Sequence, residues 1–525
     1  MMEENSVISN SIKEDNSEND RTMNQGGPEV NLPNNGFAVR KEHLILLMGS
    51  LLLGILANIL FYASEWGISI PIFVAAFYML LYLCCGKELK IKANLPWALS
   101  IPVLLLSFTY LFYSNMIFYI LNFMAIALLI VAQTMLITGN NAFSWHTPGF
   151  LVDILYGFFY RFFAFVNKPF KVIASAFPTK EKNPGAGVVR KVLLGLVISV
   201  PLLLIVVTLL VSADAIFESY MERIPDIFEG VKIGEYFGRA IFVLFVLFTS
   251  FSFLFSLMEK KKPATSIEGD GSVKLTKVWD PVVVITIMVL VNVIYLMFVA
   301  IQFAYLFGGA ELALPGGFTY SEYARRGFFE LITVTVINFG IMLLFIGFTK
   351  MSNRTAGKIL RCLYSLLVGN TAVMLASAYY RMLLYEGAYG FTYLRVLTQA
   401  FMIFMFVLFG ISLFRIWRDG FSLAKPFIVT AIAAFVIVNY LNVDCIIARN
   451  NIDRYYKTDK IDVDYLSTLS YDALPEIAKL KAADGKLAED IAGLIRGKSK
   501  NALENNDWQS FNIARYRAGR MQAGN

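Results

Sequence analysis

Residues 281–306 read PVVVITIMVLVNVIYLMFVAIQFAYL and contain no charged side chain. A helix needs about 20 apolar residues to cross the hydrocarbon core of a bilayer, so this stretch predicts a membrane span. Ten further runs of similar length and composition occur, and short polar breaks separate most of them. The eleven predicted spans are 43–62, 68–85, 96–113, 116–138, 189–212, 236–258, 281–306, 327–349, 359–384, 393–416 and 425–443.

The composition of the whole chain agrees with a membrane protein. Its 525 residues are only 16% charged, against roughly 25% in an average soluble domain, and the mean hydropathy is +0.60. These values exclude a cytosolic enzyme, a disordered regulator and a secreted disulfide scaffold. We therefore predict an all-α, polytopic membrane protein with about eleven transmembrane helices and a small C-terminal helical domain. The helix count depends most on Ser114–Asn115, a tight turn between the third and fourth predicted spans.

Lysine and arginine predict the orientation of the spans. With the N-terminus inside, the cytoplasmic breaks hold 22 of the Lys and Arg residues between positions 43 and 444, and the opposite breaks hold 7. Cytoplasmic loops carry this excess in membrane proteins, and anionic lipids of the inner leaflet attract it. We therefore expect a multi-pass cell-membrane protein with a cytoplasmic N-terminus and an extracytoplasmic C-terminus. The net charge of +7 follows from this orientation and requires no nucleic-acid partner.

Two regions of the chain depart from the pattern of spans. Residues 1–42 form an acidic, asparagine-rich tail with few apolar residues, which we expect to be disordered. The multi-pass domain then covers residues 43–444. Within it, residues 148–178 mix several phenylalanines with Arg161 and Lys168, a pattern typical of an amphipathic helix lying on the inner leaflet.

The composition changes again after Val443. Residues 445–525 hold 13 Lys and Arg and 11 Asp and Glu, which predicts a small extracytoplasmic helical domain that rests on the membrane part. Asp472 and Asp507 stand where N-caps of short helices are expected. One apolar helix face follows from the helical spacing of four residues, which are Leu487, Ile491, Leu494 and Ile495.

Sequence motifs of enzymes and metal sites are missing. The four cysteines have no CxxC spacing, and the two histidines belong to no HExxH motif. We find no phosphate loop, no dinucleotide fingerprint and no nucleophile elbow. We therefore predict no catalytic residue, no metal site and no cofactor.

Charged and amide side chains collect at the outer ends of the last four predicted spans, whereas the centres of the spans are almost free of charge. Ionisable residues within a membrane are costly to insert and often mark a function. Arg326 and Glu330 have the i, i+4 spacing of an ion pair. Asn370, Ser377 and Arg381 are spaced by seven and four residues, which predicts a polar stripe along one helix. The candidate outer polar cluster comprises Arg325, Arg326, Glu330, Asn370, Arg381, Glu386, Arg395, Asn442, Asp444 and Arg449.

This cluster has two interpretations. In the functional one, its arginines line an outward-facing pocket that binds an anionic headgroup or a phosphate, because guanidinium groups suit such ligands. In the structural one, an interfacial belt of tyrosines and a set of salt bridges hold the helix ends together. The arginines and carboxylates nearly balance, which favours the structural interpretation.

Five stretches of the chain, taken together, carry a resemblance to a known group of proteins. They are YSEYARRGFFEL (320–331), EGAYGFTYLRV (386–396), NVDCIIARNNIDRY (442–455), DVDYLSTLSYDALP (462–475) and WQSFNIARYRA (508–518). Together they resemble the bacterial integral-membrane families known as domains of unknown function 4153 and 4173, over about residues 40–520. The resemblance implies a multi-pass bacterial membrane protein, and it implies no catalytic residue because these families have no established activity.

Three functions are compatible with the sequence. The first is a non-enzymatic component of the bacterial plasma membrane in envelope maintenance or signalling, whose outer domain contacts a protein partner or the membrane surface. The alternative is a transporter or lipid-handling permease that uses the outer polar cluster as its site. The third is an envelope-lipid enzyme, which is least favoured because no nucleophile, metal site or general base stands out. The lipid bilayer is a partner in every case, and the oligomeric state stays open.

Overall fold

The computed structural model of the chain describes residues 40–86, 95–176, 233–259, 278–307, 328–350, 354–482, 485–504 and 507–523, with isolated positions between 195 and 217. Within these ranges every regular element is a helix, apart from one isolated bridge between Trp279 and Thr349. The predicted all-α, polytopic membrane class is confirmed. The predicted disordered tail lies outside the described residues as far as residue 39.

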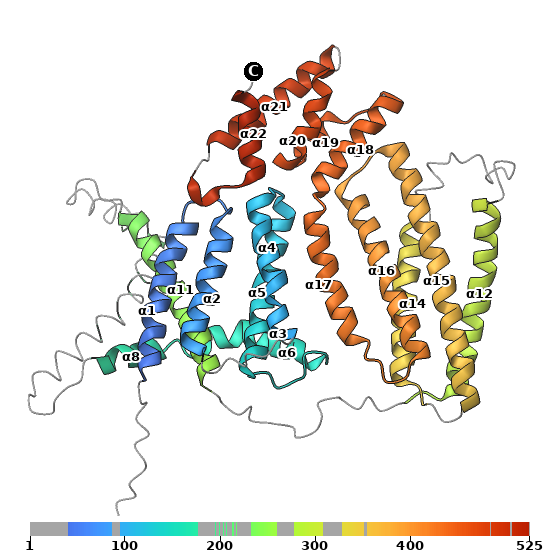
Figure 1. Cartoon of the computed structure of the whole chain (residues 1–525), viewed down its shortest axis with the longest axis horizontal. Coiled ribbons are helices and arrows are strands. Elements are labelled where there is room, and N and C mark those ends of the chain that lie inside the picture. The colour runs from blue at the N-terminus through green and yellow to red at the C-terminus, as the bar shows by residue number, and fades with distance from the viewer. Residues whose placement is uncertain are drawn as a thin grey trace, which may run out of the picture. The chain divides into compact units, whose positions relative to one another are not determined.

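The first group of helices forms the N-terminal part of the membrane domain (Figure 1). It consists of α1 (Lys41–Phe61), α2 (Ser69–Cys85), α3 (Leu95–Ala98), α4 (Ser100–Phe112), α5 (Met116–Thr138) and α11 (Ile233–Met258). Helix α1 packs along α11, and α4 packs against both α2 and α5. A Cβ on Gly54 would lie 2.7 Å from the carbonyl oxygen of Val243, so the glycine permits the close approach of α1 and α11.

The second group is a four-helix bundle built around its longest helix. It consists of α12 (Pro281–Phe307), α14 (Phe328–Phe348), α15 (Arg354–Tyr389) and α16 (Tyr393–Trp417). Helix α15 contacts each of the other three. Its apolar side chains Leu360, Tyr364 and Leu367 are buried in the core of the bundle together with Met288 of α12 and Phe409 of α16.

Helix α17 (Ala424–Tyr440) stands between the two groups and contacts α4 on one side and α16 on the other (Figure 1). At its end the chain bends by 56° into α18 (Val443–Thr458). Asn442 forms this bend with a left-handed backbone, at φ 48°, a conformation that asparagine tolerates better than most residues. The Oδ1 atom of Asn442 accepts a hydrogen bond from the backbone N–H of Cys445 at 3.2 Å, so the same residue caps α18.

Residues 443–523, which we name the C-terminal cap, pack into a small helical unit with its own core. Besides α18 it contains α19 (Val463–Thr468), η3 (Tyr471–Ala473), α20 (Leu474–Ile477), η4 (Ala478–Ala482), α21 (Lys486–Glu504), η5 (Trp508–Ser510) and α22 (Ile513–Ala523). Ile447, Leu474 and Ile477 are completely buried. Ile491 and Ile495 of the predicted apolar face are also buried, and Leu487 and Leu494 pack against the same core.

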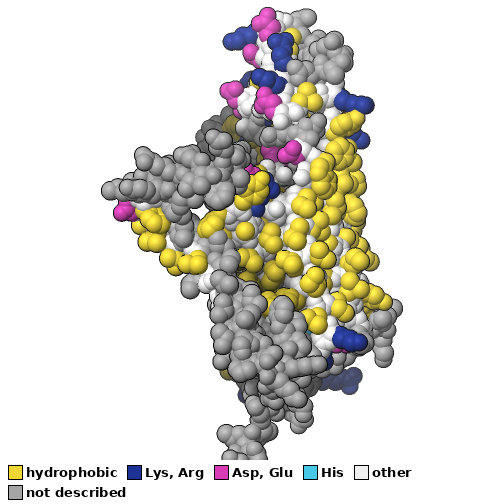
Figure 2. Space-filling view, turned by 90° about the vertical axis from the view of Figure 1, so that its left-hand side faces the viewer, with side chains coloured by type: hydrophobic (Ala, Val, Ile, Leu, Met, Phe, Trp, Pro, Cys, Tyr) yellow, Lys and Arg dark blue, Asp and Glu magenta, His cyan; other side chains and the backbone are white. Residues whose placement is uncertain are grey.

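The predicted spans coincide with described helices in ten of eleven cases, and 189–212 lies largely outside the described residues. Of the described helices, seven are long and apolar enough to cross a membrane, and the bent pair α17–α18 can be an eighth. The remaining two, α2 and the helical stretch Pro96–Phe112, are shorter. Figure 2 shows hydrophobic side chains over the middle of the visible face, with charged side chains gathered towards its two ends. The number of crossings stays a prediction.

Residues 148–178 differ from the single amphipathic helix that the sequence predicts. They are divided into α6 (Gly149–Leu155), the π-helical η1 (Tyr156–Arg161), α7 (Phe162–Ala164) and α8 (Lys168–Ala176). The break falls at Phe165–Asn167, just before Pro169 in the first turn of α8. A proline lacks the N–H that a continuous helix would pair with the carbonyl of the residue four positions earlier, here Phe165, and its ring clashes with that carbonyl. Their position on the inner leaflet stays a prediction.

Candidate functional site

The predicted outer polar cluster contributes to two separate networks. Asn442 and Asp444 belong to a junction network between the membrane helices and the C-terminal cap, and the bundle network within α12, α14, α15 and α16 contains four further predicted residues: Asn370, Arg381, Glu386 and Arg395. Glu330 and Arg449 are exposed on α14 and α18. Arg325 and Arg326 lie outside the described residues, and so does the predicted ion pair between Arg326 and Glu330.

Asp444 is the centre of the junction network. Its side chain is 2% exposed, and it joins three parts of the chain that are far apart in sequence. The Nδ2 of Asn115, at the start of α5, donates to Oδ2 of Asp444 at 2.5 Å, and the hydroxyl of Tyr393, at the start of α16, donates to Oδ1. The backbone N–H of Ser470, in the cap, also donates to Oδ1 at 3.0 Å. Bonds to a charged acceptor are stronger than neutral ones, so this carboxylate holds the cap to the membrane helices.

Asp472 is a second buried carboxylate at the same junction. The sequence predicts an N-cap here, which is wrong: Ser470 occupies the N-cap position of η3, and Asp472 lies inside the short helix. Its Oδ2 atom accepts from the backbone N–H and the hydroxyl of Ser114, at 2.7 and 2.8 Å, and from the hydroxyl of Ser470 at 2.9 Å. Asp507 does precede η5 as predicted, but its side chain makes no capping bond.

The two carboxylates influence one another electrostatically. Burial raises the pKa of Asp472 above its ordinary value, the hydrogen bonds from Ser114 and Ser470 act in the opposite direction, and the negative charge of Asp444 raises it further. Lys498 of α21 supplies a positive charge nearby and donates to the carbonyl of Leu469. Burial lowers the pKa of Lys498, and the charge of Asp444 opposes this change.

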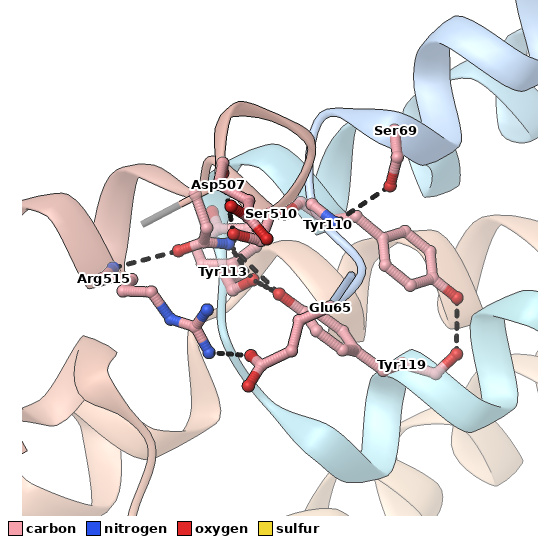
Figure 3. A network of polar contacts seen from close by, with 10 residues as sticks. Glu65, Ser69, Tyr110, Tyr113, Tyr119, Asp507, Ser510 and Arg515 are labelled. Carbon is pink, nitrogen blue, oxygen red and sulfur yellow. Dashed lines mark hydrogen bonds and ion pairs between the residues drawn. The ribbon is translucent and has the colours of Figure 1, made fainter. Parts of the chain in front are cut away.

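A second set of contacts fastens the C-terminal end of the cap to the α1–α2 and α4–α5 turns (Figure 3). The Nδ2 of Asn512 donates to the carbonyl oxygens of Tyr110 and Tyr113 at 2.8 and 2.6 Å. Arg515 forms an ion pair with Glu65, and the two side chains point towards each other in Figure 3. A Cβ on Gly67 would lie 2.6 Å from the backbone of the η5–α22 segment, so only glycine allows this approach.

Polar groups continue from the junction a short way down into the membrane helices. Nδ2 of Asn122 on α5 donates to Thr109 of α4 at 2.9 Å and to Oδ1 of Asn439 on α17 at 2.7 Å. A cavity lined by these residues, Asp444 and Asp472 has a volume of about 10 Å³. This space admits one water molecule and no substrate.

The bundle network consists of amides and hydroxyls between α12, α14 and α15. Nδ2 of Asn370 donates to Oδ1 of Asn292 at 3.2 Å. One helical turn away, the hydroxyl of Tyr295 donates to Oδ1 of Asn338 at 2.6 Å, and Nδ2 of Asn338 donates to Thr371 at 2.9 Å. These side chains satisfy each other across helices, which is how polar groups are accommodated inside a membrane protein.

Nearer the cap, the bundle network contains two charged residues. Gln302 of α12 accepts hydrogen bonds from the hydroxyl of Ser377 at 2.8 Å and from Nη2 of Arg381 at 3.2 Å. Arg381 is 6% exposed and Glu386 is completely buried. Nε2 of Gln399 on α16 donates to Oε2 of Glu386 at 2.5 Å. The polar stripe predicted on α15, Asn370, Ser377 and Arg381, therefore faces α12, and Glu386 beyond it contacts α16.

Arg395 is also engaged by the protein itself. Its guanidinium lies over the ring of Tyr385, 4.2 Å from the centroid, and donates to the carbonyl of Gly390. The α15–α16 turn is in turn tied to the cap, because the amide of Asn451 exchanges two hydrogen bonds with the backbone of Phe391, at 2.8 and 2.9 Å. Both networks thus include residues of α16, and the turn before α16 is hydrogen-bonded to the cap.

In the described part of the chain, the polar residues are arranged to hold helices together more clearly than to react with a substrate. Two carboxylates, a lysine and two serine hydroxyls meet at the junction, but both carboxylates, Asp444 and Asp472, are buried and the cavity beside them has only the volume of a water molecule. No group of three or more His, Cys, Asp or Glu able to hold a metal ion occurs among the described residues. Sequence reasoning missed Ser114, Asn115 and Ser470; the one signal for the first two was the short polar turn between two spans.

Comparison with known proteins gives one match. The model of the family described as "Domain of unknown function (DUF4153)" matches residues 100–480. No curated protein and no solved structure matches the chain. The family match covers the junction and bundle residues up to position 480, and it ends within the C-terminal cap, before α21.

Proposed function

The chain belongs to the DUF4153 family, and we propose that it is a non-enzymatic component of the bacterial plasma membrane that presents its C-terminal cap to a partner in envelope maintenance or signalling. The N-terminus is cytoplasmic and the cap extracytoplasmic in this proposal. The distribution of Lys and Arg, 22 against 7 on the two sides, supports the orientation.

The junction network is the observation that carries the proposal. Asp444 and Asp472 accept hydrogen bonds from groups of the α4–α5 turn, of α16 and of the cap itself. Such an arrangement fixes the position of the cap on the membrane helices. A catalytic pair of carboxylates would instead need space for a substrate, and the cavity of about 10 Å³ provides none.

The surface that the cap offers to a partner is a broad groove between α19 and α21. Its volume is about 680 Å³, and its lining includes Asp464, Asp490, Lys486 and Asn501. Gly493 and Gly497 leave the backbone of α21 open at its floor, since nothing lies within 4 Å of either Cβ position. A groove with charges of both signs suits a polar protein segment better than an acyl chain.

The proposal is tested by complementation of a strain that lacks the gene, with sensitivity to envelope-damaging detergent as the measurement. We expect Asp464→Lys together with Asp490→Lys to abolish complementation at normal protein level, and Glu489→Lys, an exposed charge reversal on α21 outside the groove lining, to complement. Full complementation by the double variant would count against a partner on this groove.

The alternative function is a transporter or lipid-handling permease, and the buried Arg381 favours it. A cation buried in the span α15 is the type of residue that lines a substrate path. In the same assay, a permease predicts that Arg381→Gln stays abundant and fails to complement, whereas the cap variants complement. An envelope-lipid enzyme is the third hypothesis, and no described group of residues favours it.

A further inference from the structure

An apolar groove lies between α5, α6 and α17, at the end of the membrane domain opposite to the C-terminal cap (Figure 1). Its volume is about 420 Å³, within the range of about 300–1,000 Å³ that is usual for ligand sites. Of its sixteen lining residues, none is acidic and two, His146 and Thr147, are polar. Helices α5 and α17 diverge here, so the two halves of the membrane domain are not packed together at this level.

The groove has the length of a lipid tail. Its lining runs from Leu128 to Leu136 on α5 and from Ala424 to Ile432 on α17. Eight residues of helix correspond to a rise of about 12 Å, and one leaflet of the hydrocarbon core is about 15 Å thick. Helix α5 ends and helix α17 begins at this side of the membrane domain. The groove therefore runs along the membrane normal within a single leaflet.

The chemistry of the lining suits hydrocarbon and excludes water. Apolar cavities of this kind stay dry and take up apolar ligands. A groove of about 420 Å³ between membrane helices therefore has the volume and the lining to take up an apolar chain.

Polar and cationic groups gather at the same end of the membrane domain. Lys425 follows the lining residue Ala424 in the first turn of α17, and its side chain is exposed. Nδ1 of His146 is buried and has no hydrogen-bond partner within the described part of the chain. Trp145 lines the groove beside His146, and tryptophan is typical of the level of the lipid headgroups. Lys425 supplies a positive charge next to the groove, and the lining contains no carboxylate. This combination is complementary to an anionic headgroup.

We propose that this groove binds one anionic phospholipid, with an acyl chain between α5, α6 and α17 and the phosphate beside Lys425 and His146. The lipid completes the contact between the N-terminal helices and α17, which the protein side chains leave open at this level. Because phosphate is also a good hydrogen-bond acceptor, it provides a partner for Nδ1 of His146 in the tautomer that carries its hydrogen there. The proposal depends on membrane insertion and not on the partner of the cap.

The test uses purified full-length protein, delipidated in detergent and titrated with phosphatidylglycerol, with retained lipid counted by native mass spectrometry. We expect one phosphatidylglycerol to be retained per chain, and phosphatidylcholine to be retained less. Ala132→Trp fills the groove from α5, where Ala132 is 6% exposed, and should abolish retention. The matched control is Ala300→Trp, on the exposed face of α12 outside the groove, which should retain the lipid.

The headgroup contact is tested separately. Lys425→Ala should weaken binding of phosphatidylglycerol about fivefold, the effect of one lysine near an anionic lipid, and leave phosphatidylcholine unchanged. Lys358→Ala, an exposed lysine near the start of α15, is the control and should have no effect. Should Ala132→Trp not fold, Ala424→Trp fills the groove from α17. Equal retention by the wild type and a folded groove-filling variant would overturn the acyl-chain site, and equal affinity for both lipids would overturn the anionic preference.

Discussion

The junction network and the bundle network use similar residues in different surroundings. At the junction, two buried carboxylates of the cap accept hydrogen bonds from backbone N–H groups, hydroxyls and an amide. In the bundle, between membrane-spanning helices, the contacts of α12 and α15 are chiefly between neutral amides and hydroxyls, such as Asn292 with Asn370. The difference lies in the supply of donors. Each junction carboxylate accepts hydrogen bonds from several groups, including backbone N–H groups of the kind that a continuous helix has already used, whereas the buried Glu386 of the bundle accepts one described hydrogen bond, from Gln399.

This comparison predicts that single substitutions at the junction have larger effects than those in the bundle. The donors at the junction converge on one group, so its removal leaves several of them buried without a partner. In the bundle the contacts are pairwise, and the unfolded chain in a membrane also finds polar partners. Four measurements order these effects.

The largest effect is expected from Asp444→Ala. The substitution leaves the donors of Asn115, Tyr393 and Ser470 without their acceptor, and we expect the free energy of opening of the cap to fall by about 3 kcal/mol. Hydrogen exchange of the amides of α21 in lipid nanodiscs measures this opening. Asp464→Ala, an exposed carboxylate of the same cap, is the control and should change it by less than about 0.5 kcal/mol.

Asn442→Ala should destabilise α18 by about 2 kcal/mol. About half of this comes from the lost capping bond to Cys445 and half from the left-handed backbone that alanine adopts poorly. Asn442→Gly loses the same capping bond but adopts the left-handed backbone freely, so it should lose only about 1 kcal/mol. The same exchange experiment, read at the first turns of α18, separates the two variants. Equal losses in both would mean that the left-handed conformation contributes nothing.

The pH dependence of the junction should be smaller and has a definite sign. Because the pKa of Asp472 is raised in the folded state, the folded state binds more protons than the unfolded state between the ordinary pKa and the raised value. The stability of the cap should therefore decrease as the pH rises through this window. Asp472→Asn removes the contribution, so its cap stability should vary less between pH 4 and pH 7. A steeper pH dependence in the variant would contradict the assignment.

The smallest effect is expected in the bundle. A double-mutant cycle of Asn292→Ala and Asn370→Ala should give a coupling of about 0.6 kcal/mol, the average for hydrogen bonds between membrane helices. Reversible unfolding in mixed micelles measures it. A coupling above about 2 kcal/mol would show that the two networks do not differ in the way proposed.

The helices could be predicted from the sequence because hydropathy and helical period are local properties. The stripe of Asn370 and Arg381 on α15 follows from the same period. The junction could not be predicted in this way, since Asn115 and Asp444 are 329 residues apart and no local pattern reports such a pair. The sequence predicts a helix N-cap at Asp472 because this residue precedes a run with a helical pattern. Pro169 is the residue in the sequence that indicates a break within residues 148–178.

The bend at Asn442 makes α18 a lever. With 16 residues the helix is about 24 Å long, and it leaves the axis of α17 at 56°. If the joint is stiff, a tilt of α17 by about 10° in the bilayer displaces the far end of α18 by up to about 4 Å. Changes in bilayer thickness, which act on the tilt of a spanning helix, would then reach the C-terminal cap through this joint.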